Sequence, residues 1–366
     1  MLKNGQLSIL ITRLQNIGDM LAFIPALRNL RQYCPDAHIA LLTKHAGGVE
    51  IIKNCPYVDE IITVRNRSLK EKMRLVRKFR RLRIDYFLIS PQDLGRVPWA
   101  LMGGAKKIIG NKKIKYCQVT KKEKLTSFID IEPKYSTDAT ETENCASVVR
   151  AALEDMNIDL PNHLDLSYEY SWFKKESYDE FADLMGKYHF NKHNYAVIAP
   201  FSAKRSSKNW SNEKWAKICE YLIKEKNIEK LVFAGGPAEG IMINGLIAQL
   251  TANIQEVSIN LAGETSLDLS ALIIHYSNIF VGLDSGPCHL ASAVNTPAVV
   301  LYGPGDFNRW YPPETTAPRH NIYLGVDCSP CDYKDCPVAH DCMKLITVND
   351  CIFGIDEVLK DKDEQE

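Results

Sequence analysis

Short apolar runs rich in β-branched residues alternate with helix-period segments along most of the chain, and this alternation restricts the fold more than any other feature. The first half has such runs at residues 7–12, 38–43, 60–64, 84–90 and 106–110. A second series follows at 195–199, 230–234, 278–282 and 297–302. Strands that alternate with helices form parallel sheets covered on both faces. We therefore predict an α/β fold of two Rossmann-like, doubly wound domains facing a central cleft, with ligands at the carboxyl ends of the strands.

The length of the chain and the polar stretch between the two series predict the domain boundaries. A chain of 366 residues exceeds one ordinary core and fits two domains of common size. Residues 111–170 are polar and irregular, which we interpret as the end of the first domain and a surface passage. We expect a first domain at 1–170, a linker at 171–192, a second domain at 193–345, and a C-terminal helix and tail at 346–366.

One predicted helix of the first domain is strongly basic. Its apolar residues, which recur at helical spacing, are Leu69, Met73, Val76, Phe79 and Leu82. Its basic residues are Lys70, Lys72, Arg74, Arg77, Lys78, Arg80, Arg81 and Arg83. Residues 1–125 hold 25 Lys and Arg against 9 Asp and Glu, whereas the remainder holds 20 against 36. This split favours an anionic partner for the first half, and a solvated helix face is the alternative.

Composition excludes several classes of protein. The apolar fraction of 45% is enough for packed cores, so the chain is not globally disordered. No apolar run reaches the length of a membrane-spanning helix, about 18 residues. Because the first strand run begins at Leu7, we expect no signal peptide. Eleven cysteines, odd in number and sparse for this length, favour a reduced, cytoplasmic protein.

The turn after the first strand run carries a carboxylate. Gly18 makes the turn, and Asp19 stands at the start of the following helix. At this edge of a sheet a carboxylate can act as a general base, provided that an acceptor hydroxyl lies within hydrogen-bond reach. The alternative is a helix cap, which is the commoner role of Asp at such a place. The pattern by itself leaves both roles open.

A turn of small residues, Asp284-Ser285-Gly286, follows the run at 278–282, and a helix opens behind it with Pro287 in its first turn. Exposed N–H groups and the helix dipole at such a place suit a diphosphate. Asp284 would repel a phosphate, so we expect it to hold the turn or to accept sugar hydroxyls. His289, one turn inside, is suited to donate to a phosphate oxygen. Purely structural roles for Asp284 and His289 stay open.

Two other turns of the second domain add polar groups. Ser202 and Lys208 lie in the loop after the run at 195–199, where the ammonium can neutralise a phosphate. Glu239 follows a Gly-Gly-Pro turn and is suited to bind a ribose diol. Each loop alone is also compatible with plain solvation. The combination of several strand-end turns at one edge predicts a nucleotide pocket.

Several cofactor motifs are absent, and one cysteine cluster is present. The chain has no Gly-x-Gly-x-x-Gly after its first strand run, no Walker A motif and no Gly-x-Ser-x-Gly elbow. Cys328, Cys331, Cys336 and Cys342, with His340 nearby, are candidate ligands of zinc or an iron–sulfur cluster. Their spacing matches no common zinc motif, which favours a reduced or disulfide-linked loop. The basic helix lacks interleaved aromatic residues for base stacking, which argues against nucleic acid.

Taken together, these segments resemble the heptosyltransferase family, glycosyltransferase family 9, whose members build the inner core of lipopolysaccharide. The matching segments are Arg13-Leu14-x-x-Ile17-Gly18-Asp19, Ile24-Pro25-Ala26-Leu27, Lys208-x-Trp210, Asp284-Ser285-Gly286-Pro287-Cys288-His289-Leu290-Ala291, Thr296-Pro297 and Gly303-Pro304. The closing cysteine segment is also similar to that of members of the family. The resemblance covers nearly the whole chain in order. Gly305 departs from it, because members often have Thr at this place.

The resemblance implies a GT-B fold, with the acceptor on the N-terminal domain and the nucleotide sugar on the C-terminal one. It implies an inverting, metal-independent transfer that needs no cofactor besides the ADP-sugar donor. Asp19 would be the base that deprotonates the acceptor hydroxyl, and Lys208 would stabilise the leaving diphosphate. The donor-binding residues would be Ser202, Glu239, Asp284, Ser285, Gly286 and His289.

We therefore expect a glycosyltransferase that moves a heptose from ADP-heptose to a lipopolysaccharide inner-core acceptor, an anionic lipid-linked glycan. The basic first domain would meet this acceptor, with peripheral contact at the cytoplasmic face of the inner membrane. Two alternatives stay open. One is a transferase of the same fold for another nucleotide sugar or glycan acceptor, and the other is a non-catalytic protein that binds nucleotide sugars or polyanions. Turnover that is abolished by Asp19→Ala, with donor binding kept, would favour the enzyme.

Overall fold

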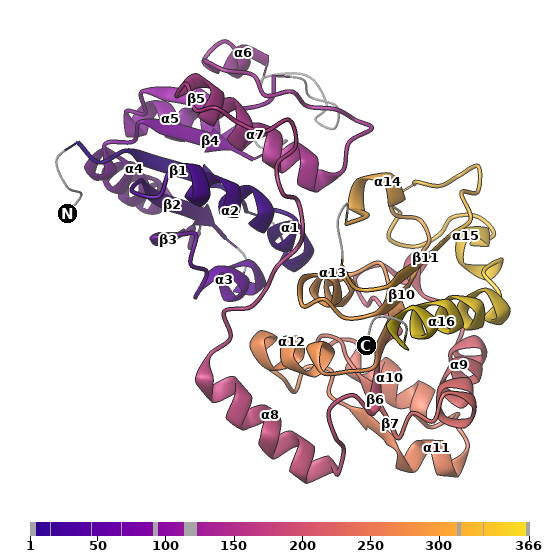
Figure 1. Cartoon of the computed structure of the whole chain (residues 1–366). Coiled ribbons are helices and arrows are strands. Elements are labelled where there is room, and N and C mark those ends of the chain that lie inside the picture. Colours follow the sequence, from indigo (N-terminus) through magenta and orange to yellow (C-terminus); the bar gives the residue numbers. More distant parts are fainter. Residues whose placement is uncertain are drawn as a thin grey trace. The chain divides into compact units, whose positions relative to one another are not determined.

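The computed structural model describes residues 5–14, 16–44, 46–66, 68–90, 94–112, 123–312, 316–331 and 333–363. The chain folds into two compact units, Met1–Ser167 and Tyr168–Glu366. Each unit is built on one parallel sheet with helices packed against it (Figure 1). In the described part of the chain, no helix has the combination of length and apolarity that crossing a bilayer requires.

The first unit has a five-stranded sheet in the order β3-β2-β1-β4-β5. Its strands are β1 (Ser8–Thr12), β2 (His38–Thr43), β3 (Glu60–Thr63), β4 (Tyr86–Ile89) and β5 (Lys107–Ile109). All pairings are parallel, and every residue of the central strand β1 is buried. Strands β2 and β3 lie on one side of β1, and the later strands β4 and β5 lie on its other side. In folds of this class, ligands bind at the carboxyl ends of the strands that flank such a switch.

Helices cover this sheet through apolar stripes. They are α1 (Ile17–Leu21), α2 (Ile24–Tyr33), α3 (Ala46–Ile52), α4 (Leu69–Leu82), α5 (Val97–Gly103), α6 (Glu123–Thr126) and α7 (Glu141–Asp155), with a 3₁₀ turn η1 at Leu94–Arg96. On α4, Leu75, Phe79 and Leu82 enter the core, where Phe79 meets Phe87 of β4 edge to face at 5.9 Å. Helix α2 packs against α7.

The second unit has a six-stranded parallel sheet in the order β11-β10-β9-β6-β7-β8. Its strands are β6 (Tyr195–Ala199), β7 (Lys230–Phe233), β8 (Ser258–Asn260), β9 (Ile279–Leu283), β10 (Ala298–Tyr302) and β11 (Arg319–Tyr323). The order reverses between β6 and β9, so the loops after these two strands border the switch point. Those loops carry Lys208 and Asp284.

The helices of the second unit are α8 (Lys175–Tyr188), α9 (Asn212–Glu225), α10 (Gly240–Ile247), α11 (Ala252–Glu256), α12 (Leu267–His275), α13 (Gly286–Ala293), α14 (Phe307–Trp310), α15 (Asp341–Lys344) and α16 (Val348–Asp363), with a 3₁₀ turn η2 at Ser206–Lys208. Ser211 caps α9, since its side chain accepts from the Lys214 N–H. An apolar cluster joins the sheet to α9 and α16 through Trp215, Leu222 and Ile355.

These observations confirm the predicted class: two parallel α/β units of the doubly wound, GT-B type. Two sequence interpretations were wrong in detail. Residues 111–170 are not irregular throughout, because they contain α7, whose start is fixed by a complete capping box between Thr140 and Glu143. Residues 171–192, expected as a linker, contain α8, whose buried Phe181 stacks on Tyr276 at 5.4 Å between ring centroids.

The packed face of α4 also differs from the expected one. Leu69 is 71% exposed and Met73 is 46% exposed, whereas Leu75 is buried. The physical reason is Glu71, which takes the buried place in the first turn. Its carboxylate accepts from the Arg65 N–H at 3.0 Å and from Arg74 at 2.7 Å, and these bonds turn the helix so that Leu69 faces solvent.

Candidate functional site

A buried ion pair lies at the carboxyl edge of the second sheet. The Lys208 ammonium donates to the carboxylate of Asp284 and to its backbone oxygen, both at 2.6 Å. Their side chains are 14% and 5% exposed. Burial alone would raise the pKa of Asp284, but the positive charge of Lys208 and its neighbours outweighs burial and holds this pKa below its ordinary value. Asp284 is therefore an anion at neutral pH, and it holds the ammonium at the switch point.

His289 lies one turn into α13, beside the same carboxylate. Its Nε2 is 3.8 Å from Asp284 Oδ1, and the ring packs between Tyr168 and Trp310. Burial is the largest influence on this ring and lowers its pKa to about 4, against the attraction of Asp284. The ring is thus neutral at pH 7. Its buried Nδ1 has no hydrogen-bond partner among the residues that the structure describes.

The backbone around this pair is built from small residues. Ser285 is the N-cap of α13 with an extended backbone, and Gly286 and Pro287 form the first turn. At Gly305 a Cβ atom would lie 2.7 Å from Asp284 Oδ2 and 3.6 Å from Lys208 Nζ. The glycine at this place is explained by this close approach, because a larger residue would displace the carboxylate that holds Lys208.

The loops that carry Ser202 and Glu239 are in contact at the ends of the neighbouring strands β6 and β7. One carboxylate oxygen of Glu239 accepts from the Ala203 N–H at 2.9 Å, and the Ser202 N–H donates to Asn209 Oδ1 at 2.8 Å. The loop that bears Lys208 is therefore tied to the glycine turn before α10. All six predicted donor-binding residues and Lys208 lie at the carboxyl edge of one sheet, in strand-end loops or, for Gly286 and His289, at the start of α13.

One charged residue of this region was not predicted. Arg319, on β11, donates to the Ser292 hydroxyl and to the Tyr302 hydroxyl, the latter at 3.3 Å. Its positive charge also acts on Asp284 and His289. The strand that carries Arg319 has little apolar character, so the sequence pattern gave no signal for it.

Asp284, Cys288 and His289 form the one group in the described part of the chain whose three candidate metal-ligand atoms lie within 4.8 Å of one another. The Lys208 ammonium already neutralises Asp284. Burial raises the pKa of the Cys288 thiol to about 11, so the sulfur is protonated at neutral pH and is a poor ligand. Arg319 is a second cation nearby. The group around Asp284 and His289 therefore suits an anion better than a metal ion.

The four cysteines of the closing segment line one cavity of about 170 Å³ together with His340. Cys328, Cys331, Cys336 and Cys342 are free thiols in the structure. Burial and the charge of the other three cysteines raise the pKa of Cys342 to about 11. The segment also contacts the Lys208 loop, because Ser207 donates to the Lys334 and Tyr333 carbonyl oxygens. Among the described residues, these four thiols do not form a group whose ligand atoms all lie within 4.8 Å of one another. Their role as metal ligands stays a prediction.

In the first unit, Asp19 lies in the first turn of α1 with its side chain 18% exposed. Its carboxylate accepts from the Asn16 N–H at 3.2 Å, so it does cap the helix. It also contacts the buried guanidinium of Arg13 at 3.4 Å. Arg13 in turn meets Glu141 of α7 at 2.8 Å. Neither Arg13 nor Glu141 was predicted as part of a site.

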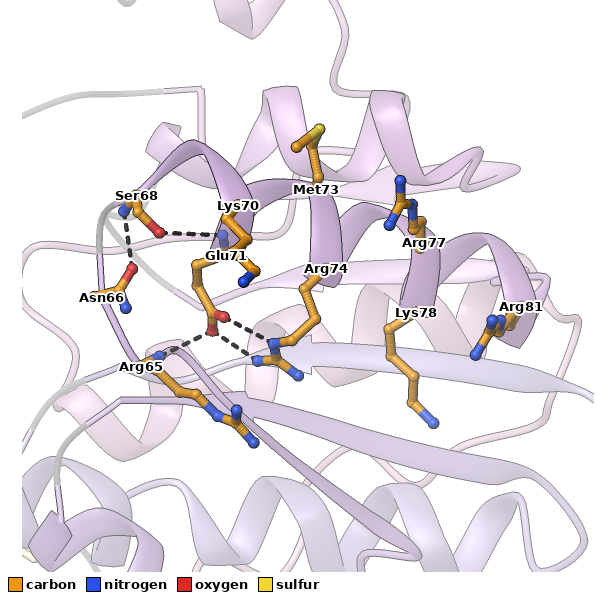
Figure 2. Close-up of a pocket in the computed structure, with 10 residues that line it drawn as sticks. All are labelled: Arg65, Asn66, Ser68, Lys70, Glu71, Met73, Arg74, Arg77, Lys78 and Arg81. Carbon is orange, nitrogen blue, oxygen red and sulfur yellow. Dashed lines mark hydrogen bonds and ion pairs between the residues drawn. The ribbon is translucent and has the colours of Figure 1, made fainter.

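A basic groove of about 570 Å³ runs along α4 (Figure 2). Figure 2 shows Glu71, Arg74 and Lys78 directed toward the strands, with Met73 directed away from them. Arg74 pairs with Glu71 and Lys78 pairs with Glu60. Of the other basic side chains of the groove, Lys70, Arg77 and Arg81 make no ion pair within the described residues. The groove is thus a cationic surface with charges left for an anionic partner.

Comparisons with known proteins agree with this geometry. The sequence profile of glycosyltransferase family 9 (heptosyltransferase) matches residues 126–340. Lipopolysaccharide heptosyltransferase 3 of Escherichia coli K12 is 25% identical over 305 residues, which cover 81% of this chain and 82% of that protein. The structure of E. coli ADP-heptose lps heptosyltransferase II aligns with a TM-score of 0.76 at 21% identity, over 98% of this chain and 100% of the other. E. coli heptosyltransferase WaaC with ADP-2-deoxy-2-fluoro heptose aligns with a TM-score of 0.66 at 17% identity, over 96% and 99% of the two chains.

Proposed function

The chain belongs to glycosyltransferase family 9 (heptosyltransferase) and is a glycosyltransferase, and from this premise we propose that it moves a heptose from ADP-heptose to a lipopolysaccharide inner-core acceptor. The observation that carries the proposal is the buried pair of Lys208 and Asp284 at the switch point of the second sheet. This is where a fold of this class binds a nucleotide. The similar E. coli enzymes are named for ADP-heptose or were studied with an ADP-heptose analogue, which supports ADP as the carrier.

The proposed role of Lys208 follows from its charge and setting. Negative charge develops on the diphosphate as the sugar leaves, and a fixed ammonium in a site with little solvent stabilises that charge strongly. Lys208 supplies this charge without a metal ion. Ser285 and Gly286 present the first N–H groups of α13 for the phosphate oxygens. Ser202 and Glu239, on the neighbouring loops, would contact the donor's nucleoside and sugar.

The proposed role of Asp19 is that of the base in an inverting transfer. A single displacement needs a group that removes the proton from the acceptor hydroxyl as it attacks the sugar. The Asp19 carboxylate is partly exposed and anchored on two sides, by Asn16 and by Arg13. An anchored base keeps a fixed direction toward the hydroxyl, which favours attack.

The groove on α4 supports an anionic, lipid-linked acceptor and a peripheral membrane location. Its unpaired cations Lys70, Arg77 and Arg81 suit phosphate groups. The exposed Leu69 and Met73 stand on the same helix and would enter the boundary between headgroups and acyl chains. An acceptor with phosphates close to its lipid portion would satisfy both features.

Calorimetry with ADP, UDP and GDP tests the donor site. We expect wild-type protein to bind ADP best and Lys208→Ala to bind it at least about tenfold more weakly, since one charged contact contributes about 1.5–3 kcal/mol. Lys204→Ala is the matched control, because Lys204 lies in the same loop and is exposed. Far-ultraviolet circular dichroism checks that each variant is folded. Preference for UDP or GDP would keep the fold and overturn ADP-heptose, and no nucleotide binding at all would overturn the donor site.

A further inference from the structure

A buried charge network joins four elements of the first unit. Arg13 follows β1, Asp19 lies on α1, Ser90 follows β4 and Glu141 begins α7. The Arg13 guanidinium has no exposed surface. Its Nε donates to the Asp19 backbone oxygen at 3.0 Å, and one terminal nitrogen donates to Ser90 Oγ and Glu141 Oε1, both at 2.8 Å. The other terminal nitrogen contacts the Asp19 carboxylate at 3.4 Å. One cation thus connects two carboxylates.

Glu141 is not needed to start its own helix. The capping box of α7 is complete with Thr140 and Glu143, whose side chains bond to each other's backbone N–H groups. Glu141 is 2% exposed, and its carboxylate is directed to Arg13 instead. A buried ion pair gives little net stability compared with apolar residues of the same size. Stability of the fold alone therefore does not account for the pair.

We infer that Glu141 is a positioning residue for the transfer: its carboxylate holds the Arg13 guanidinium against Asp19 and offsets its charge, so that Asp19 keeps both its direction and its strength as a base. This inference rests on the proposed role of Asp19. Without Glu141, the charge of Arg13 would act on Asp19 uncompensated, and a carboxylate that faces an uncompensated cation is a weaker base. Without Arg13, Asp19 would lose contacts from both its backbone and its carboxylate.

Other ionisable groups lie on the elements that carry the network or pack against it. Cys145, one turn after Glu141, has its sulfur 4.0 Å from Glu141 Oε1. Glu50 lies on α3, which packs on α1. On α2, Arg28 pairs with Asp165 and Arg31 with Asp59, so their charges are matched elsewhere. The Arg13 guanidinium lies over the ring of Phe23, with its central carbon 5.8 Å from the ring centroid.

The test is the pH dependence of turnover in Glu141→Gln, which keeps the size and an acceptor oxygen but removes the charge. Asp19 must be ionised to act, so the acid limb of the kcat profile follows its pKa. We expect this limb to move about one pH unit lower. We expect kcat on the plateau to fall about tenfold, while KM for the donor changes by less than about twofold, since the donor loops belong to the other unit. Glu143→Gln, an equal change on the same helix, is the control and should leave the limb in place.

The outcomes separate this inference from the proposed function. If Glu141→Gln behaves like Glu143→Gln, or loses activity with no shift of the limb, Glu141 is only structural and the inference is wrong. Should Glu141→Gln fail to fold, the double variant Arg13→Gln/Glu141→Gln removes both buried charges. Because the two charges offset each other at Asp19, the limb should then stay within about 0.5 pH unit of its wild-type position, and a limb that moves by about one unit or more overturns the inference. Asp19→Asn tests the underlying proposal, because full activity in that variant would remove Asp19 as the base whatever Glu141 does.

Discussion

Direct contact with a cation, and not burial alone, decides the charge of the titratable residues at the edge of the second sheet. Asp284 and His289 are equally buried and lie beside each other, yet the first is an anion and the second is neutral. The difference lies in Lys208, whose ammonium contacts Asp284 directly. This part of the sheet edge therefore combines an ion pair with an uncharged ring, which can donate one hydrogen bond without adding positive charge.

The neutral His289 makes stability depend on pH. Its pKa is lowered from an ordinary value of 6.5 to about 4. Between these values the unfolded chain binds a proton at this histidine and the folded chain does not, so stability is complete above pH 6.5 and falls as the pH drops toward 4. In His289→Gln the free energy of unfolding should fall less between pH 6.5 and pH 4 than in wild type, by up to about 3 kcal/mol. Urea unfolding at pH 7 and pH 4.5 measures it, with the exposed His163→Gln as control. Equal pH slopes in wild type and His289→Gln would contradict the assignment.

Gly305 is a second residue whose role can be tested alone. A Cβ atom there would lie 2.7 Å from the Asp284 carboxylate, so Gly305→Ala should displace Asp284 and disturb Lys208. We expect ADP affinity to fall about tenfold, within the ~1–3 kcal/mol typical of overpacking. Gly245→Ala is the control, since nothing lies within 4 Å of its Cβ position in the exposed part of α10. Calorimetry should show unchanged ADP affinity in the control, and a tight-binding Gly305→Ala would show that the contact is unimportant.

The residues around the buried ion pair of the second unit are easier to find in the sequence than the network of the first unit. Lys208, Asp284 and His289 stand in strand-end turns whose small residues are visible in a short stretch of sequence. Arg13 and Glu141 are separated by 128 positions, and no local pattern tells which carboxylate will face a buried arginine. That pairing exists only once α7 packs beside β4.

At the level of elements, β-branched runs predicted nine strands, and all of these except β3 are buried along most of their length. Two edge strands escaped this rule. Strand β8 has only three residues, and β11 reads Arg-His-Asn-Ile-Tyr with one buried position. Helix α7 was missed for another reason: its capping box lies in a strongly charged stretch, which was interpreted as surface loop. Polar residues that start a helix resemble a loop until the buried face behind them is recognised.

The first turn of α4 provides a test at this scale. Bonding to Arg74 is the main cause that lowers the pKa of Glu71 to about 2. The pair should therefore stabilise the fold above the ordinary Glu pKa, and this stabilisation is lost as the pH falls from about 4.5 to about 2. Because Arg74 is 37% exposed, solvent screening limits the effect, and Glu71→Gln should cost about 1 kcal/mol at pH 7 and less at pH 2.5.

Urea unfolding at the two pH values measures this difference. Glu154→Gln is a suitable control, since Glu154 pairs loosely with Arg150 on the exposed side of α7 at 3.8 Å. It should change stability by less than about 0.5 kcal/mol. A cost for Glu71→Gln that is independent of pH would show that shape, and not charge, fixes the start of α4.

For the whole molecule, zero formal net charge conceals a strong separation of charge along the chain. The basic part includes α4, whose Arg77 and Arg81 make no ion pair among the described residues. We expect binding to phosphatidylglycerol vesicles that weakens steeply with salt, because each cation near an anionic surface contributes about 1 kcal/mol. Arg77→Gln/Arg81→Gln should lower vesicle affinity about tenfold or more. Lys187→Gln/Lys192→Gln in the second unit is the control, and equal losses in both double variants would show a nonspecific charge effect.

The contacts of the Lys208 loop also determine when, during synthesis of the chain, this loop can take its final geometry. Ser207 is held by Tyr333 and Lys334, Trp210 donates to the Ile346 carbonyl oxygen, and Lys214 donates to the same oxygen. These partners are made more than 120 positions later than the loop itself. A nascent chain on the ribosome can thus form β6 and α9 well before the loop between them acquires its final geometry. If the Lys208 loop binds the donor as proposed, nucleotide binding should appear only in chains that include residue 346.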